Sequence, residues 1–263
     1  MSNIRPPAVA GSFYPADADT LAADVRALLA TPAASSLIPK ALIVPHAGYM
    51  YSGPVAASAY ASLRTVASRI RRVILLGPTH RIPVHGLALP EADTFSTPLG
   101  PVRLDEEARQ ALAALPQVTV SAPAHAFEHA LEVQLPFLQM TLHDFTLLPL
   151  AVGDASAEDV AEVLLRLWGG DETLIVISSD LSHYLPYEVS RLVDQKTAQD
   201  ILKLRPGITH DEACGATPIN GLLLAARRHH LTPHLLDLRN SGDTAGPRDG
   251  VVGYAAFIFS KGE

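Results

Sequence analysis

The chain has 263 residues, of which 48% are hydrophobic and 18% are charged, and its formal net charge at pH 7 is −7. This acidic balance, and the lack of any basic run longer than a pair such as Arg71-Arg72, argue against nucleic acid and acidic membranes as partners. No stretch approaches the roughly eighteen apolar residues of a membrane span, the segment MSNIRPPAVAGSFYP lacks a signal-peptide core, and the single cysteine excludes an internal disulfide, so we expect a cytoplasmic protein.

Apolar periodicity and capping residues predict helices that alternate with strands along the chain. Helices are predicted over 17–29, 54–63, 105–115, 128–140, 157–168, 187–204 and 218–229. Strands are predicted over 41–46, 71–76, 145–152, 173–177, 235–238 and 251–259, with a hairpin-like excursion made by 87–89 and 102–104 and a connection over 31–39. This alternation favours an α/β fold, a single domain over 1–263 with a mainly parallel or mixed central sheet flanked by helices.

Three of the predicted strands run directly into side chains that bind metals or move protons. These side chains are His46, His80, and Asp180 with His183 three residues further on. In an open α/β sheet, ligands and catalytic groups lie just beyond the carboxyl ends of the strands. We therefore expect all four side chains at one edge of one sheet, in an active site or a metal site.

Each of these positions also has a plainer interpretation. His46 is followed by small residues and two glycines, so it suits a turn in which the imidazole only bonds a carbonyl group. Asp180 is spaced to orient His183 and raise its basicity, as a general base requires, but it is equally suited to cap the start of a helix. The apolar strand before Asp180 and the second titratable group after it favour the functional interpretation.

His129 is predicted on a helix, with Glu128 and Glu132 beside it. Its spacing is not that of a His-Glu-x-x-His zinc protease, because Val133 stands where the second histidine would be. Taken alone, it is typical of an ordinary helix histidine.

Cys214 precedes a predicted helix in which Thr217 is the N-cap and Pro218 lies in the first turn. The dipole at a helix start lowers the pKa of a nearby thiol, so we expect a reactive or metal-ligating thiolate. The alternative is a buried, inert thiol.

Seven motifs follow one another from one end of the chain to the other: RPPAVAGSFYP over 5–15, PHAGY over 45–49, GPTH over 77–80, EHALEVQLP over 128–136, SSDLSH over 178–183, CGATPI over 214–219 and NSGDT over 240–244. Together they resemble the Memo family, whose bacterial and archaeal members are called AmmeMemoRadiSam system protein B. The family is similar in fold to the class III extradiol ring-cleaving dioxygenases. The resemblance therefore implies a dioxygenase-like α/β domain over nearly the whole chain.

The resemblance also implies a metal site. His46 and His80 match the two metal-binding histidines of the family, and Cys214 falls where the dioxygenases have a glutamate as the third ligand. A His-His-Cys site is softer than one with a carboxylate, and it suits copper or zinc as well as the Fe(II) that ring cleavage requires. Fe(II) is the metal that we expect.

The other matching residues would act on a substrate. His183 matches the acid-base histidine of the dioxygenases, Asp180 lies beside it, and His129 matches a further histidine that lines the pocket. We therefore expect His183, Asp180 and His129 to be catalytic residues.

Two functions from different classes follow. The first is a metal-dependent oxidoreductase of dioxygenase type acting on a small molecule such as a catechol. The second is a protein that uses the same cleft to bind a peptide or a partner. The family resemblance implies radical S-adenosylmethionine or AMMECR-type proteins as partners.

No Gly-x-Ser-x-Gly, Walker or Gly-x-Gly-x-x-Gly motif is present, which disfavours serine hydrolases, P-loop enzymes and dinucleotide-dependent dehydrogenases. A metallohydrolase is a third, weaker alternative, because no second carboxylate ligand is evident.

Overall fold

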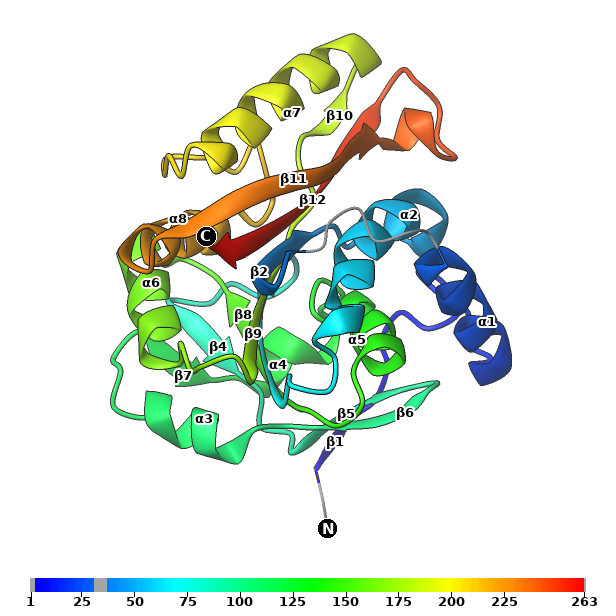
Figure 1. The fold of residues 1–263 in the computed structure, drawn as a ribbon. Coiled ribbons are helices and arrows are strands. Elements are labelled where there is room, and N and C mark those ends of the chain that lie inside the picture. Colours follow the sequence, from blue (N-terminus) through cyan, green and yellow to red (C-terminus); the bar gives the residue numbers. More distant parts are fainter. Residues whose placement is uncertain (1–2, 31–36, 263) are drawn as a thin grey trace.

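The computed structural model describes residues 3–30 and 37–262, and it is built around one large mixed β-sheet (Figure 1). The strands follow the order β10-β12-β2-β9-β3-β8-β4-β7, and β11 pairs with β12. Their bounds are β2 Pro39–Val44, β3 Arg72–Pro78, β4 Leu87–Leu89, β7 Val118–Val120, β8 Thr146–Val152, β9 Thr173–Ser178, β10 His183–Leu185, β11 Leu231–Asn240 and β12 Val251–Lys261. The part of the predicted connection over 31–36 lies outside the described residues.

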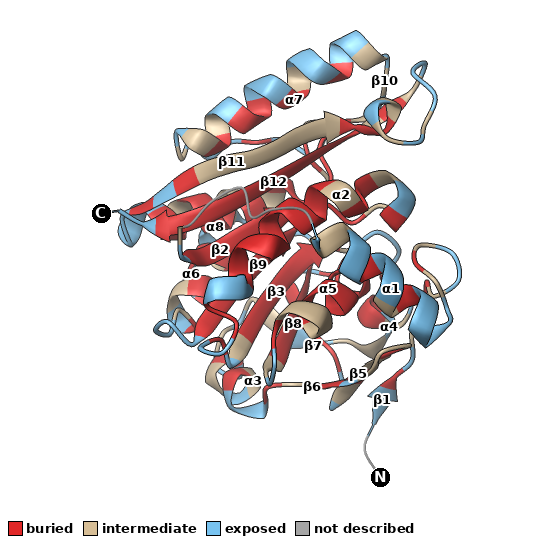
Figure 2. Cartoon of the chain, turned by 45° about the vertical axis from the view of Figure 1, so that its right-hand side comes forward, coloured by how far each residue is buried: buried red, intermediate tan, exposed pale blue. Residues whose placement is uncertain are grey.

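The centre of the sheet consists of four parallel strands, β2, β9, β3 and β8. They are rich in Val, Ile and Leu and almost wholly buried, as strands covered on both faces must be (Figure 2). Antiparallel strands flank them, since β12 pairs with β2 and β4 pairs with β8. The predicted α/β class and the mixed central sheet are confirmed.

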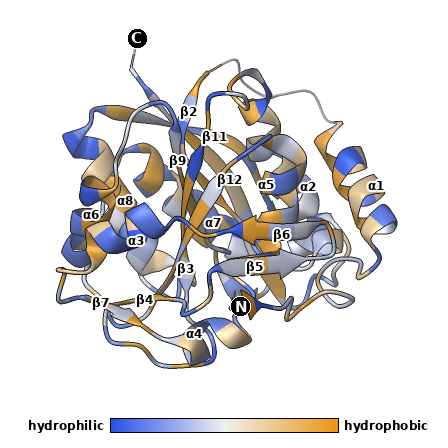
Figure 3. Cartoon of the chain, turned by 90° about the horizontal axis from the view of Figure 1, so that it is seen from below, coloured by the Kyte–Doolittle hydropathy of each residue, from blue (hydrophilic) through white to orange (hydrophobic). Residues whose placement is uncertain are grey.

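Helices cover both faces of the sheet. The helices are α1 Ala18–Leu29, α2 Tyr49–Tyr60, α3 Glu106–Leu112, α4 Ala122–Ala126, α5 Leu135–Thr141, α6 Ala157–Arg166, α7 Tyr187–Leu202 and α8 Ala216–Arg228, with 3₁₀ turns η1 Ala61–Thr65, η2 Glu132–Gln134 and η3 Ser241–Asp243. One hydrophobic core unites α1, α2 and α5 with the sheet, and the other unites α3, α6, α7 and α8 with its opposite face. The outer surfaces of α1, α3 and α6 are hydrophilic (Figure 3). Of the helices within the described ranges, none has the length and apolar character to cross a bilayer.

The predicted hairpin pairs different segments from those expected. Strands β5 (Thr94–Thr97) and β6 (Gly100–Arg103) form it, and β1 (Ile4–Arg5) joins β5 in a separate small sheet. Segment 87–89 instead pairs with β8 and β7 of the main sheet. The reason is burial: β4 is buried along its whole length, whereas β5 alternates between partly and fully buried residues, as a strand with one face on the core does.

Three predicted helix starts are wrong. The helix predicted over 54–63 is α2, which begins at Tyr49 and contains Pro54 in its interior. Residues 127–131 form no helix, because η2 and α5 begin only at Glu132 and Leu135, and Pro136 fits the first turn of α5, where no amide hydrogen is needed. His129 therefore lies in a turn. The N-cap of α8 is Gly215 rather than Thr217, since the Gly215 amide donates to Ser179 Oγ at 2.9 Å and fixes the start of the helix.

Candidate metal centre

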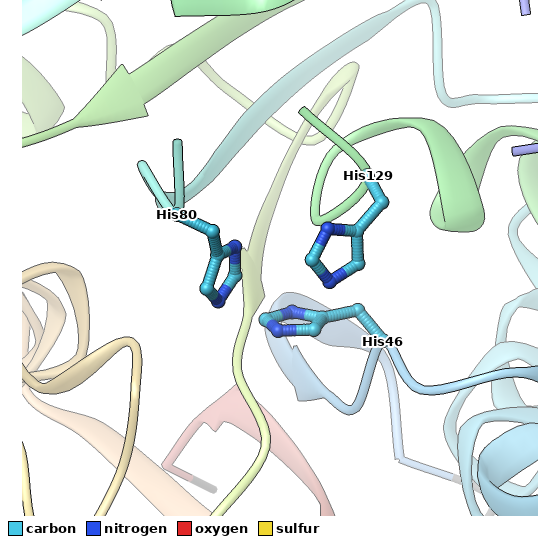
Figure 4. Close-up of side chains that lie close together, drawn as sticks. All are labelled: His46, His80 and His129. Carbon is cyan, nitrogen blue, oxygen red and sulfur yellow. The ribbon is translucent and has the colours of Figure 1, made fainter. Parts of the chain in front are cut away.

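Three histidines from three segments converge at the carboxyl edge of the parallel strands (Figure 4). His46 follows β2, His80 follows β3, and His129 lies in the turn before η2. One ring nitrogen from each can be chosen so that all lie within 4.8 Å of one another. The ring centroids are 5.2 Å apart for His46 and His80, 5.3 Å for His46 and His129, and 4.5 Å for His80 and His129. The cluster therefore brings three imidazoles around one point, as a metal ion requires.

Hydrogen bonds fix the tautomer of His46. The hydroxyl of Ser178 donates to the Ala130 carbonyl at 2.6 Å, so Ser178 Oγ must accept from His46 Nδ1, which lies 2.9 Å away. Gln134 Nε2 also donates to Ser178 Oγ, at 2.8 Å. With Nδ1 protonated, Nε2 of His46 carries a lone pair that faces the site.

Glu128 orients His80 with both carboxylate oxygens. Oε1 lies 2.8 Å from His80 Nδ1, and Oε2 accepts from the His80 amide at 2.6 Å. Burial opposes ionisation of this carboxyl, but the hydrogen bonds and charge of His80 outweigh it and lower the pKa of Glu128 to about 2. An ionised acceptor at Nδ1 leaves the Nε2 lone pair of His80 for a metal, in the carboxylate–histidine arrangement common at metal sites.

Two imidazoles of the cluster, the buried His46 and the partly buried His129, are neutral at physiological pH. Burial, followed by repulsion from His80, lowers the pKa of His46 to about 3. Burial, followed by repulsion from His46, lowers the pKa of His129 to about 4. Metal binding at these two nitrogens therefore displaces no protons near neutral pH.

Cys214 lies beside this cluster. Its Sγ is 3.4 Å from His46 Nε2, 3.6 Å from the Asp180 carbonyl oxygen and 3.8 Å from Ser179 Oγ. Burial and the nearby Asp180 carboxylate raise the pKa of the thiol to about 12, so the expected low thiol pKa is wrong: burial outweighs the helix start. The neutral thiol has one hydrogen, and its two acceptors are Nε2 of His46 and the carbonyl oxygen of Asp180. The histidine cluster has His129, rather than Cys214, as its third member.

Asp180 and His183 lie at the same edge of the sheet, but the hydrogen bond that Asp180 accepts comes from His46 rather than from His183. Asp180 is buried, and its Oδ1 accepts from the backbone amide of His46 at 2.7 Å, so it supports the histidine cluster rather than capping a helix. Burial raises the pKa of this carboxyl. His183 begins β10 and lines a cleft of about 690 Å³.

That cleft adjoins the histidine cluster at His80. It is lined by His80, His183, Cys214, Leu185, Val193, Lys196, His210, Asp211 and Glu212. His80 and Cys214 thus connect the cluster with a space large enough for a small molecule. The sequence does not reveal Glu128 and Ser178 as supporting residues. The one available signal is the adjacency of Glu128 to His129, and it is equally typical of two neighbours on a helix.

The segment before His183 is held by a buried carboxylate. Asp194 of α7 accepts from the Ser182 amide at 3.1 Å and from Ser190 Oγ at 2.9 Å. The carboxylate lies against Gly253 of β12, where an added Cβ would be only 2.1 Å from Asp194 Oδ2. Only glycine leaves room for this contact.

We expect Gly253→Ala to lower the free energy of unfolding by about 1–3 kcal/mol, the usual cost of overpacking a core. The new methyl group must displace the Asp194 carboxylate, which leaves the Ser182 amide without its hydrogen-bond acceptor. Urea denaturation measures the loss. Gly250→Ala is the matched control, because the atom nearest to its Cβ would be the carbonyl oxygen of Tyr184, 3.8 Å away. Equal losses in both variants would contradict the steric argument.

Comparison with known proteins identifies the family. The model of the Memo family, described as "Memo-like protein", matches residues 5–258. A MEMO1 family protein of Aquifex aeolicus is 35% identical over 268 residues, covering 97% of this chain and 99% of the relative. Another MEMO1 family protein, from Methanosarcina barkeri, is 36% identical over 272 residues, with the same coverage.

A solved structure shares the fold at much lower identity. An uncharacterized protein of Escherichia coli K12 superposes with a TM-score of 0.52 at 13% identity, covering 83% of this chain and 98% of that one. This likeness supports the α/β architecture alone. The family match and the relatives go further, because they extend over almost the entire sequence, and the chain belongs to the Memo family.

Proposed function

We propose that this chain binds one redox-active metal ion, Fe(II), through His46, His80 and His129, with the thiolate of Cys214 completing the donor set. The convergence of the three imidazoles within 4.8 Å supports it most directly. Nitrogen and sulfur donors together suit iron, copper and zinc. Of these, iron fits the dioxygenase-like resemblance.

The position of Cys214 explains how a thiol with a raised pKa becomes a ligand. Its Sγ lies 3.4 Å from Nε2 of His46, whose lone pair a metal would take. Occupation of that lone pair removes the acceptor, and a nearby cation stabilises the thiolate. The thiol would then lose its proton, and the thiolate of Cys214 would be available to hold the ion.

The proposed reaction is oxidation of a small molecule in the cleft beside His80 and Cys214. Bound Fe(II) would offer open positions to substrate and dioxygen and would supply electrons. His183 lines the same cleft, so its imidazole is placed to take a proton from a substrate hydroxyl group. Asp180 holds the His46 backbone, and Glu128 holds the His80 ring.

We expect His183→Ala to reduce oxygen uptake by about 10²–10⁴-fold while leaving iron content unchanged, because the imidazole moves a proton and holds no metal. The test is metal analysis of anaerobically purified protein, followed by oxygen uptake with a panel of catechols. His85→Ala is the control, since that side chain is fully exposed. Iron-loaded wild type that consumes no oxygen with any catechol would overturn the proposed reaction.

A second candidate is recognition of a peptide or protein partner at the same cleft. Tyr184 favours it: the residue is 80% exposed, its backbone has a φ of 58°, and its ring lies 5.9 Å from that of His183. An exposed aromatic ring held in a costly backbone conformation is typical of a contact site. Binding of a radical S-adenosylmethionine or AMMECR-type protein that is lost in Tyr184→Ala, in a chain without oxygen uptake, would favour this candidate.

A further inference from the structure

The loop of residues 128–130 contacts all three histidines of the cluster. Glu128 binds the ring and the amide of His80, and His129 is itself a member. The Ala130 carbonyl accepts from Ser178 Oγ, which in turn binds Nδ1 of His46. A shift of this one loop would therefore move or reorient every imidazole in the site.

This loop lies between α4 and η2, and its outer side is held by Arg5, a residue of β1 that is distant in sequence. Arg5 Nε donates to the His125 carbonyl at 3.0 Å, and Nη2 donates to the Glu128 carbonyl at 2.7 Å. Nη1 forms an ion pair with Glu132. The guanidinium thus binds the chain before, within and after the loop.

Both members of this ion pair are buried, with exposed side-chain fractions of 5% for Arg5 and 0% for Glu132. The Glu132 carboxylate also accepts from the Ala8 amide at 2.7 Å, the Val9 amide at 3.0 Å and the Tyr14 hydroxyl at 2.5 Å. These bonds dock segment 5–14 onto the loop.

The docked segment reaches the cluster itself. The ring of Phe13, which lies between the anchored residues Val9 and Tyr14, has its centroid 4.8 Å from that of His129. Arg5 and Glu132 therefore support the metal cluster along two routes, through the loop backbone and through the packing of Phe13.

We propose that Arg5 is a positioning residue for the metal centre: by fixing the backbone of residues 125–132 it sets the affinity of the histidine cluster for metal. The inference rests on the proposed metal site. A planar fork that reaches two carbonyl groups and a carboxylate at once cannot be reproduced by the single ammonium of lysine. A purely structural ion pair would stabilise the fold without changing metal affinity.

The test compares Arg5→Lys with Arg72→Lys. Arg72 also binds two carboxylates, Asp105 at 2.7 Å and Glu107 at 2.9 Å, but it lies at the start of β3, on the edge of the sheet away from the cluster. Co(II) affinity by chelator competition, the Co(II) absorption spectrum and the urea midpoint of the metal-free protein are measured for each variant.

We expect both variants to have a lower urea midpoint. Only Arg5→Lys should bind Co(II) about 10–100-fold more weakly, with a changed spectrum, the usual effect of losing support around metal ligands. Wild-type affinity and spectrum in folded Arg5→Lys would overturn the inference alone. A wild-type chain that binds no Co(II) would overturn the proposed metal site, and the inference with it.

Glu132→Gln provides the same test with a milder change if Arg5→Lys does not fold. The amide keeps the volume of the side chain but loses the charge that holds the guanidinium. Weaker Co(II) binding in folded Glu132→Gln supports the positioning role, and unchanged binding contradicts it.

Discussion

The metal affinity of the wild-type chain is expected to increase with pH more steeply than that of Cys214→Ser. The ratio of the two affinities should grow about tenfold per pH unit, or about a thousandfold from pH 6 to pH 9. The pKa of the Cys214 thiol is raised to about 12 in the metal-free protein, so a thiolate ligand must release one proton when the metal binds. The pKa values of His46 and His129 are about 3 and 4, so these two ligands release none in this range.

The measurement is chelator competition with Co(II) at several pH values, together with the thiolate-to-cobalt charge-transfer absorption. Subtracting the slope of Cys214→Ser cancels contributions from all other groups. Equal slopes without charge-transfer absorption would remove Cys214 from the donor set and leave a site of three histidines.

His46→Gln should weaken Co(II) binding by more than about 100-fold, because loss of a ligand has a larger effect than loss of a supporting residue.

The metal-free protein is expected to lose several kcal/mol of unfolding free energy between pH 6.5 and pH 4. The pKa values of His46, His125 and His129 are lowered from 6.5 to about 3, 4 and 4, in each case chiefly by burial. The unfolded chain therefore binds more protons than the folded chain in this window, and stability falls as the pH falls.

Glu128 extends the loss to lower pH. Its pKa is lowered from 4.5 to about 2 because the hydrogen bonds and charge of His80 outweigh burial, so its contribution is present above about 4.5 and disappears towards 2. Urea denaturation at each pH measures the slope. His125→Gln, which removes one of the three imidazoles with lowered pKa values, should reduce the slope between pH 6.5 and 4 by about a third. A stability that stays constant from pH 6.5 to 4.5 would contradict the buried, neutral state of these rings.

The sequence was enough to predict the parallel centre of the sheet and the approach of His46 and His80, because apolar runs that end in Gly, Pro and His carry this information locally. It was not enough to place His129 in a turn. That outcome depends on Arg5, whose contacts with the carbonyl groups of His125 and Glu128 no local pattern reveals.

The predicted low pKa of the Cys214 thiol was wrong for a related reason. A helix start is visible in the sequence and indicates a lowered thiol pKa, but burial against Asp180 is a tertiary effect and acts in the opposite direction. Similarly, the hydrogen bond from His46 Nδ1 to Ser178 Oγ could not be predicted. Its direction depends on the carbonyl group of Ala130, which belongs to a different segment.

The strand order β2-β9-β3-β8 has a consequence for how the chain reaches its native state. Neighbouring parallel strands are joined through long connections, and the groups around the cluster come from residues 46, 80, 128–130, 178–180 and 214. Such non-local pairing forms slowly, after the entropy of closing long loops has been lost. A folding intermediate that contains only part of the sheet cannot assemble the site. Metal would therefore bind late in folding, after the last of these segments has reached its native position.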